Sequence, residues 1–215
     1  MKPLGKLKIK WSPKLAYALG LLATDGNLSN DERHFSFSSK DKEQIENFLS
    51  CIGANNKITS NRSGAGNVSL RTQIGDIRFY KFLKSIGLIP AKTKTIAVLK
   101  IPKKYFFDFL RGHFDGDGTF YSYFDPRWRA SYMFYTTFVS ASEKHINWLR
   151  SVLNNRLKIS GHITKNRKSS IYQLKYAKAE SLKLLPKLYY NPEVICLSRK
   201  RHKIEKALAV IGEKL

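Results

Sequence analysis

Two aspartates in equivalent settings are the residues whose chemistry stands out. Asp25 ends the stretch "ALGLLATDG", and Asp117 ends the stretch "LRGHFDGDG". Acidic residues are scarce, with 16 Asp and Glu against 39 Lys and Arg. Two carboxylates brought together bind hard divalent cations such as Mg²⁺, which prefer carboxylate and phosphate oxygens. Such a cluster can activate water and stabilise the leaving oxygen in phosphodiester hydrolysis.

The excess of basic residues points to a polyanionic partner. The formal net charge is +23, and self-repulsion of that size is best tolerated where counter-charge arrives. Nucleic acid is the first candidate and an anionic membrane surface the second. The basic residues are spread along the whole chain, unlike a single amphipathic membrane helix, and no apolar run approaches the ~18 residues of a membrane span. We therefore expect a nucleic-acid partner and no membrane.

The aspartates must be positioned by the helix-like stretches before them. Ser12 and Pro13 form a helix-start signature, and leucines then recur at helical spacing up to the first Asp-Gly pair. A second such stretch opens with Pro102 and ends at the second Asp-Gly pair. Each predicted helix carries a glycine midway, Gly20 or Gly112, where glycine costs roughly 1 kcal/mol relative to alanine. Small residues at equivalent positions indicate a close helix crossing that brings the two aspartates together.

The same order of elements occurs twice. Helix, strand, strand, helix, strand, strand, helix is predicted over residues 1–100 and again over 101–215. The nine extra residues of the second copy are expected in an enlarged loop around "FDPRWR". We predict an α+β fold of two repeats, each with a four-stranded antiparallel sheet.

The two nine-residue stretches resemble the motif for which the LAGLIDADG homing endonucleases are named. Both copies depart from it: Ala23 and Thr24 replace Asp-Ala in the first, and Arg111 and His113 replace apolar residues in the second. The final Asp-Gly pair is present in both. The resemblance implies a pseudo-twofold monomer with two saddle-shaped sheets. It also implies an intron-encoded enzyme that makes a metal-dependent double-strand cut in a long, asymmetric DNA site.

The resemblance also implies site residues. The catalytic carboxylates and metal ligands are Asp25 and Asp117, joined by the carbonyls of Thr24 and Gly116, with Mg²⁺ as cofactor. Basic residues that would polarise the phosphate or the water follow the third helix of each repeat: Lys92 or Lys94, and Arg199 or Lys200. Asp115 is expected to be structural, because Ala23 stands at its equivalent position.

Alternation along the predicted strands separates a core face from a polar face that would contact the major groove. Phe35 and Phe37 mark the core face. The candidate DNA-binding residues on the polar face and at the hairpin tips are His34, Ser36, Ser38, Lys40, Arg62, Ser69, Arg71, Gln73, Lys165, Arg167, Lys168, Gln173 and Lys175.

Two other functions remain open beside the nuclease. One is a maturase-like protein of the same fold that binds intron RNA, and the other is a sequence-specific DNA-binding regulator. Retention of both aspartates favours the enzyme. Cys51 and Cys196 lie in apolar contexts without CxxC spacing and are predicted to be buried thiols in a reducing compartment. The N-terminus lacks an apolar signal core, so we expect an intracellular protein, in the cytoplasm or nucleoid or in an organelle matrix.

Overall fold

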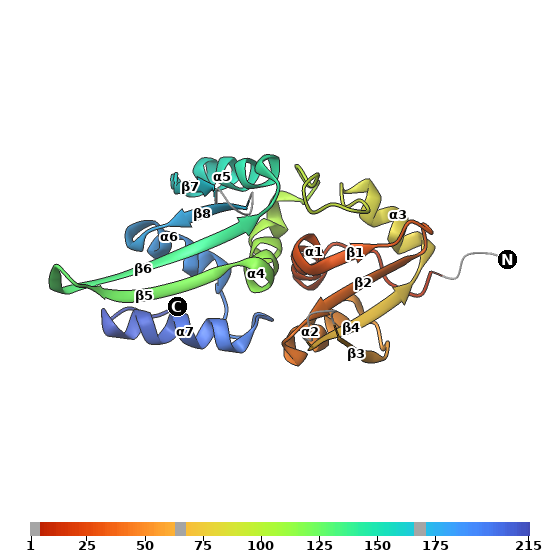
Figure 1. Cartoon of the computed structure of the whole chain (residues 1–215), viewed down its shortest axis with the longest axis horizontal. Coiled ribbons are helices and arrows are strands. Elements are labelled where there is room, and N and C mark those ends of the chain that lie inside the picture. Colours follow the sequence, from red (N-terminus) through yellow and green to blue (C-terminus); the bar gives the residue numbers. More distant parts are fainter. Residues whose placement is uncertain (1–4, 63–67, 166–170) are drawn as a thin grey trace.

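Two four-stranded antiparallel sheets flank a central pair of helices (Figure 1). The computed structural model describes residues 5–62, 68–165 and 171–215. The strand orders are β1-β2-β4-β3 and β5-β6-β8-β7, so the two sheets have the same topology. The predicted α+β fold with two repeated sheets is confirmed.

The N-terminal half holds the first sheet and three helices. Its elements are α1 (Pro13–Asp25), β1 (Gly26–Leu28), β2 (His34–Ser39), α2 (Lys42–Ile52), β3 (Ile58–Arg62), β4 (Val68–Gly75) and α3 (Ile77–Ser85). The C-terminal half repeats this order and adds one helix at its end. Its elements are η1 (Lys103–Tyr105), α4 (Phe106–Asp117), β5 (Thr119–Asp125), β6 (Trp128–Ser140), α5 (Glu143–Leu157), β7 (His162–Lys165), β8 (Tyr172–Tyr176), α6 (Lys178–Leu188) and α7 (Ser198–Val210).

The start of α1 follows from its sequence. Ser12 is in extended conformation, and its hydroxyl accepts a hydrogen bond from the Leu15 amide at 3.1 Å. Pro13 occupies the first helical position, where its missing N–H costs nothing. The helix is buried continuously from Leu15 to Ala23 because sheets and helices surround it. In the second half, the short 3-10 helix η1 follows Pro102, and α4 begins directly after it at Phe106.

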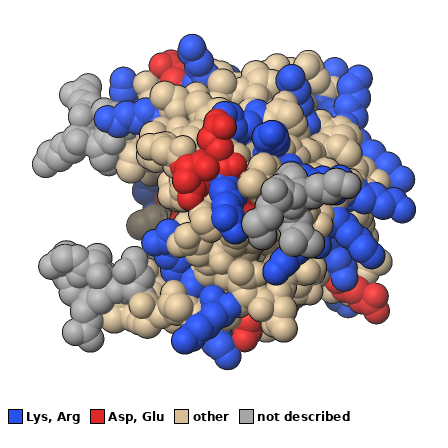
Figure 2. Space-filling view, turned by 90° about the vertical axis from the view of Figure 1, so that its right-hand side faces the viewer, with Lys and Arg blue, Asp and Glu red and all other residues tan. Residues whose placement is uncertain are grey.

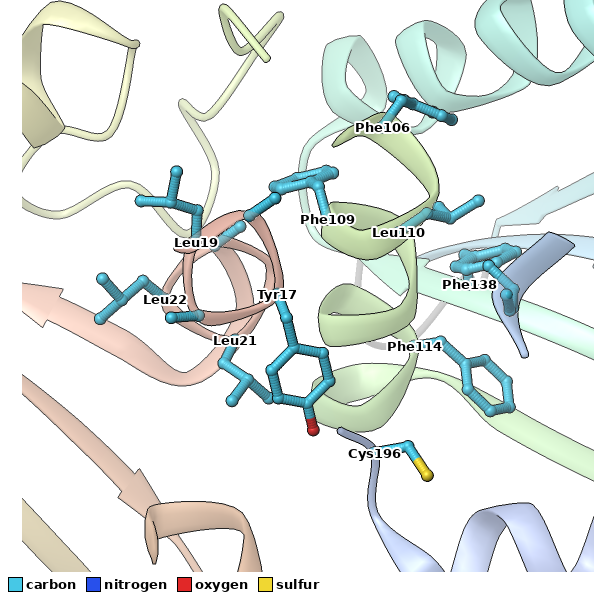
Figure 3. Packing of buried hydrophobic residues seen from close by; sticks show 14 of the residues in the cluster. Tyr17, Leu19, Leu21, Leu22, Phe106, Phe109, Leu110, Phe114, Phe138 and Cys196 are labelled. Atoms are coloured by element: carbon cyan, nitrogen blue, oxygen red, sulfur yellow. The ribbon is translucent and has the colours of Figure 1, made fainter. Parts of the chain in front are cut away.

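Helices α1 and α4 cross backbone against backbone, as their glycines predicted. A Cβ on Gly20 would lie 2.1 Å from the Phe109 carbonyl oxygen, and a Cβ on Gly112 would lie 2.0 Å from the Tyr17 carbonyl oxygen. No side chain fits in either place. Figure 3 shows Leu19 and Leu22 of α1 directed away from α4, and Phe114 of α4 on the side of Phe138 of the second sheet.

The nine extra residues of the second half lengthen two strands and do not form the expected loop. β5 and β6 have 7 and 13 residues, whereas β1 and β2 have 3 and 6. The predicted loop around Arg127 is a tight turn at the end of a long hairpin, in which the Arg127 amide donates to Asp125 at 2.9 Å. Alternating aromatic residues continue the pairing of β5 with β6, which explains why the insertion stays in the sheet.

Each sheet packs one face against helices. Phe35 and Phe37 of β2 are fully buried, as are Phe134 and Phe138 of β6. Both cysteines are buried and unbonded, as predicted. No helix in the described part of the chain has the length and apolar character to cross a membrane.

Candidate active site

Asp25 and Asp117 lie together at the ends of the two crossed helices. Asp25 is the last residue of α1, and Asp117 is the last residue of α4. Gly116 brings the two ends into contact, since a Cβ on it would lie 2.0 Å from the Thr24 hydroxyl and 2.9 Å from Asp25 Oδ2. In the described residues, neither carboxylate forms an ion pair with a Lys or Arg. The crossing thus presents two carboxylates side by side without a direct ion pair to either.

The protein around these carboxylates disfavours their charge. Both side chains reach solvent on one side, but the surrounding protein removes part of their hydration. Loss of hydration, with repulsion from Asp117 second, raises the pKa of Asp25 to about 6. Loss of hydration also raises the pKa of Asp117. A cation placed between them would relieve the repulsion.

A buried lysine stands behind each aspartate. Lys92 donates to the Thr24 carbonyl at 3.3 Å and also to the Gly26 carbonyl. Lys200 donates to the equivalent carbonyls of the second half, Gly116 at 3.2 Å and Gly118 at 2.7 Å. The two lysines therefore cap the last turns of α1 and α4, where helix carbonyls lack intrahelical partners.

Burial lowers the pKa of both lysines. Lys92 is 6 % exposed and Lys200 is 9 % exposed. Loss of hydration lowers the pKa of each lysine to about 8, while the nearby aspartates act in the opposite direction. At neutral pH both remain mainly protonated, so each is a cation fixed within reach of an aspartate.

The structure separates the four basic candidates into two groups. It places Lys92 and Lys200 against the Asp-Gly turns. Lys94 is exposed, and Arg199 pairs with Asp41 at 2.7 Å instead of contacting an Asp-Gly turn. The difference between Lys92 and Lys94 is made by the turn that contains them, which begins at Ala91 in left-handed conformation, with φ 52°.

Asp115 lies inside the protein and not in the cluster of carboxylates. It is 1 % exposed, and its Oδ2 accepts from the Tyr17 hydroxyl and the Leu197 amide, both at 2.8 Å. Burial raises its pKa to about 6. Figure 3 shows the Tyr17 ring alongside α4, with its hydroxyl toward the segment that contains Cys196. Asp115 thus joins α1, α4 and the start of α7.

The two unusual polar residues of α4 are also buried with partners. Arg111 pairs with Asp108 at 2.9 Å and donates to the carbonyls of Leu188 and Ile195. His113 stacks on His145 with ring centroids 5.2 Å apart. These contacts explain how α4 tolerates polar residues at positions facing the core.

Family models match both halves of the chain. A model described as a LAGLIDADG-like domain matches residues 106–188, and the WhiA LAGLIDADG-like domain matches residues 15–63. The chain belongs to the LAGLIDADG family. The matched residues include both LAGLIDADG motifs, and with them Asp25 and Asp117.

Solved structures of LAGLIDADG proteins have the same fold. The homing endonuclease I-WcaI bound to its DNA recognition sequence is 13% identical, with a TM-score of 0.61 over 90% of this chain and 88% of that chain. The meganuclease I-SmaMI bound to uncleaveable DNA is 14% identical, with a TM-score of 0.61 over 94% of this chain and 93% of that chain. The N-terminal LAGLIDADG domain of DUF199/WhiA is 16% identical, with a TM-score of 0.56 over 92% of this chain and 88% of that chain. No curated protein matches by sequence.

Each LAGLIDADG half has a second sheet face that helices do not cover. In the first sheet, Ser36 pairs with Gln73 and Ser38 with Arg71, on the face opposite Phe35 and Phe37. In the second sheet, Gln173 and Lys175 of β8 face away from buried Leu174 and Tyr176. Register thus places these predicted DNA-binding residues on the open faces.

Not all of the predicted DNA-binding residues are exposed and free of contacts within the protein. Ser36 is only 3 % exposed, because the longer side chains of its cross-strand neighbours Asn27 and Gln73 flank it. His34 is held by Asp31, with 2.5 Å between Nδ1 and Oδ2. Lys40 and Lys165 are exposed, while Ser69 lies half-buried on β4. The remaining tip candidates, the Arg62 side chain and residues Arg167 and Lys168, lie outside the described residues.

The open face of the second sheet also carries aromatic residues that the strand analysis missed. Tyr121 of β5 stacks on Tyr135 of β6, with ring centroids 5.1 Å apart, and Tyr123 lies parallel to Tyr135 at 6.4 Å. The i, i+2 spacing of Tyr121 and Tyr123 in "TFYSYFD" is the signal that identifies this face. The two halves therefore present different chemistry: hydroxyl, amide and guanidinium groups on the first sheet, and tyrosines on the second. Figure 2 shows lysine and arginine spread over the end of the molecule at the first sheet, with acidic residues in a few clusters.

Proposed function

We propose that this protein is a site-specific DNA endonuclease that makes a metal-dependent double-strand cut as a monomer. The observation that supports the proposal is the duplicated centre of Asp25 with Lys92 and Asp117 with Lys200. A duplex has two antiparallel strands, and a pseudo-twofold pair of centres matches the two phosphodiester bonds of a double-strand cut. The open sheet faces on either side would contact the grooves of the duplex.

The residues fit a hard divalent cation such as Mg²⁺. The described residues contain no cluster of three or more His, Cys, Asp or Glu, so the protein ligands would be the two carboxylates and the carbonyls of Thr24 and Gly116. These carbonyls keep a second lone pair beside their bonds to the lysines. Few protein ligands suit Mg²⁺, which retains several waters. When bound, the ion would generate the attacking hydroxide and stabilise the leaving oxygen.

The chain's own residues would orient the reacting oxygens and balance the charge on the phosphate. Asp25 and Asp117 would each hold oxygens near one scissile phosphate. Lys92 and Lys200 would place an ammonium group close to the phosphate and oppose the negative charge that develops on it.

A sequence-specific DNA-binding protein that does not cut is the second candidate. The family model that matches residues 15–63 is named for WhiA and not for an endonuclease. The fold is shared by both kinds of LAGLIDADG protein, so the carboxylates and lysines are what separate the two candidates.

The deciding experiment is a cleavage selection. We would incubate the purified protein with a randomised duplex library and Mg²⁺, select bound sites, and sequence the cut ends. The nuclease proposal predicts paired cuts at a fixed position in one sequence. Asp25→Asn and Asp117→Asn should each lower double-strand cutting by about 10²-fold or more while binding is kept. Glu32→Gln, at an exposed acid paired with Lys84, is the matched charge control and should cut normally.

Tight binding to selected sites without any cut, in Mg²⁺ or Mn²⁺, would support the regulator and reject the nuclease. Full cutting by either aspartate variant would reject the roles given to these residues.

A further inference from the structure

Each buried lysine is held in place by a chain segment that docks on the opposite half of the molecule. Lys200 is the third residue of α7, and the residues just before it contact the start of α2 in the N-terminal half. Lys92 lies after α3, and the residues just after it contact α5 of the C-terminal half. We propose that these reciprocal contacts make Asp41, Glu43 and Ser142 positioning residues for the lysine of the other half. The proposal rests on the proposed function for its catalytic consequence only.

The Lys200 segment is tied to α2 by three groups. Arg199 donates to both carboxylate oxygens of Asp41, at 3.0 and 2.7 Å. The Ser198 amide donates to Glu43 at 3.1 Å, and the Ser198 hydroxyl donates to the same carboxylate. Two residues before Ser198, the Cys196 carbonyl accepts from the Asn47 side chain at 3.0 Å.

These ties fix the direction of the Lys200 side chain. Lys200 follows Arg199 in the first turn of α7, so a fixed first turn sets the position of its Cα. Its ammonium group then reaches the carbonyls of Phe114 at 2.6 Å and Asp115 at 2.8 Å as well as those of the Asp-Gly turn. An ammonium group with these acceptors has one well-defined position, and movement of the first turn would break several bonds at once.

The Lys92 segment is tied to α5 in the corresponding way. The Lys92 carbonyl accepts from the Ile96 amide at 2.8 Å, which closes the turn. The Ile96 carbonyl then accepts from the Ser142 hydroxyl, and the Ala97 carbonyl lies 2.8 Å from His145 Nδ1. Burial lowers the pKa of His145 to about 4, so the ring is neutral. Because its partner is a carbonyl, Nδ1 must carry the proton.

The two sets of contacts stand at equivalent places in the repeats. Asp41 immediately precedes α2 and Ser142 immediately precedes α5, so each tie is made at the start of the second helix of a half. The chemistry differs, with exposed ion pairs on one side and buried hydroxyl and imidazole bonds on the other. Both halves therefore have a contact at the same place, although different residue types form it.

The consequence for the proposed reaction is strand selectivity. Weakening the ties to α2 should displace Lys200 and leave Lys92 in place, so that one strand is cut slowly and a nicked duplex accumulates. Weakening the tie from Ser142 should slow the other strand. A merely structural contribution to stability would slow both strands together.

The first test needs no DNA. The rate of acylation of each lysine by an amine-reactive reagent is measured by mass spectrometry in the full chain. Asp41→Ala with Glu43→Ala should raise the rate at Lys200 roughly fivefold, equivalent to about 1 kcal/mol of local stability, and leave Lys92 unchanged. Ser142→Ala should do the reverse. Glu32→Ala with Glu46→Ala removes two exposed acids and is the charge-matched control, for which neither rate should change.

The second test follows each strand of a selected target with its own fluorophore. The α2 variant should slow one strand roughly tenfold, and Ser142→Ala should slow the opposite strand, while the control cuts both strands normally. The exchange pair Asp41→Arg with Arg199→Asp should restore the rate lost in Asp41→Arg alone.

The proposal would be overturned if these variants accelerated acylation equally at both lysines, or if they accelerated it at neither lysine. Equal slowing of both strands in a variant with lysine-specific acylation would overturn its catalytic part. Absence of any cutting by the unaltered protein would reject the proposed nuclease function, and the acylation rates would still decide whether the contacts hold the lysines.

Discussion

Asp25 and Asp117 show how a residue's role depends on what lies beside it. Each sits at a negative helix end, next to another carboxylate and partly removed from water, and all three conditions oppose its charge. The sequence repeat predicted that these two residues pair, and the helix crossing brings them together. The repeat did not predict which basic residues accompany them, because Lys92 and Lys94 are equally plausible in "AKTKT" until the turn around Ala91 is known.

The raised pKa of Asp25 predicts a pH-dependent response to Mg²⁺. Its folded-state pKa of about 6 lies above the ordinary 3.8, so this group stabilises the apo protein fully below about pH 4 and less as the pH rises through 6. Mg²⁺ binds the ionised form and should add about 2.7 kcal/mol at a concentration of 100 times Kd. We expect Mg²⁺ to raise Tm by roughly 5 °C at pH 8 and by much less at pH 5, measured by calorimetry. An equal shift in Asp25→Asn/Asp117→Asn would contradict this.

Asp115 is predicted to act through hydrogen bonds and not through charge. Asp115→Asn keeps an oxygen that can accept from Tyr17 and Leu197, so its free energy of unfolding should change little. Asp115→Ala leaves both donors buried and unpaired, at a cost of about 2 kcal/mol. Urea denaturation measures both values. A larger loss in the Asn variant than in the Ala variant would show that the charge is required. Comparison of the repeats predicted the structural role, but the partners come from distant segments and could not be predicted.

At the scale of elements, the helix crossing is the feature that the sequence predicted best. Mid-helix glycines have a physical cost and therefore need a reason, and the backbone contact between α1 and α4 supplies it. Strand alternation likewise predicted correctly that Phe35 and Phe37 mark the core face of a strand, which is β2. The prediction for the insertion was wrong because a stretch containing proline, arginine and aspartate is typical of a loop, whereas here it forms only the turn of a hairpin whose aromatic residues continue the sheet.

Adding one methyl group at the crossing should be strongly destabilising. Gly112→Ala or Gly20→Ala would force the two backbones apart, and we expect a loss of roughly 3 kcal/mol in the free energy of unfolding. The higher helix propensity of alanine acts in the opposite direction by about 1 kcal/mol. Any net loss of stability therefore comes from disruption of the helix crossing. Ser50→Ala, at an exposed position of α2, is the control and should be within about 0.5 kcal/mol of the unaltered protein. Unchanged stability in the glycine variants would mean that the helices can separate.

At the scale of the whole molecule, charge and pseudo-symmetry act together. The net charge of +23 would attract the proposed duplex without regard to sequence, while the two open faces would offer different groups to its grooves. The halves share topology but not surface chemistry, so the expected target is asymmetric. Composition predicted the polyanionic partner. The tyrosine surface of the second sheet depends on cross-strand register, which composition does not contain.

The charge predicts a steep dependence of binding on salt. With about 8–10 phosphate contacts, log K should fall with log[salt] at a slope near −8. Fluorescence anisotropy with a selected duplex in 50–200 mM salt measures this slope. A slope shallower than about −3 would mean that few phosphates are contacted and that the positive charge serves another purpose.

In the proposed nuclease, the long β5–β6 hairpin would affect the length of DNA covered on each side of the cut. At about 3.3 Å per residue, the 13 residues of β6 span roughly 40 Å and the 6 residues of β2 roughly 20 Å. One base pair occupies about 3.4 Å along the duplex, so the difference corresponds to about six base pairs. The protected segment of DNA would therefore extend further on the side of the C-terminal half, and the cut would lie off its centre.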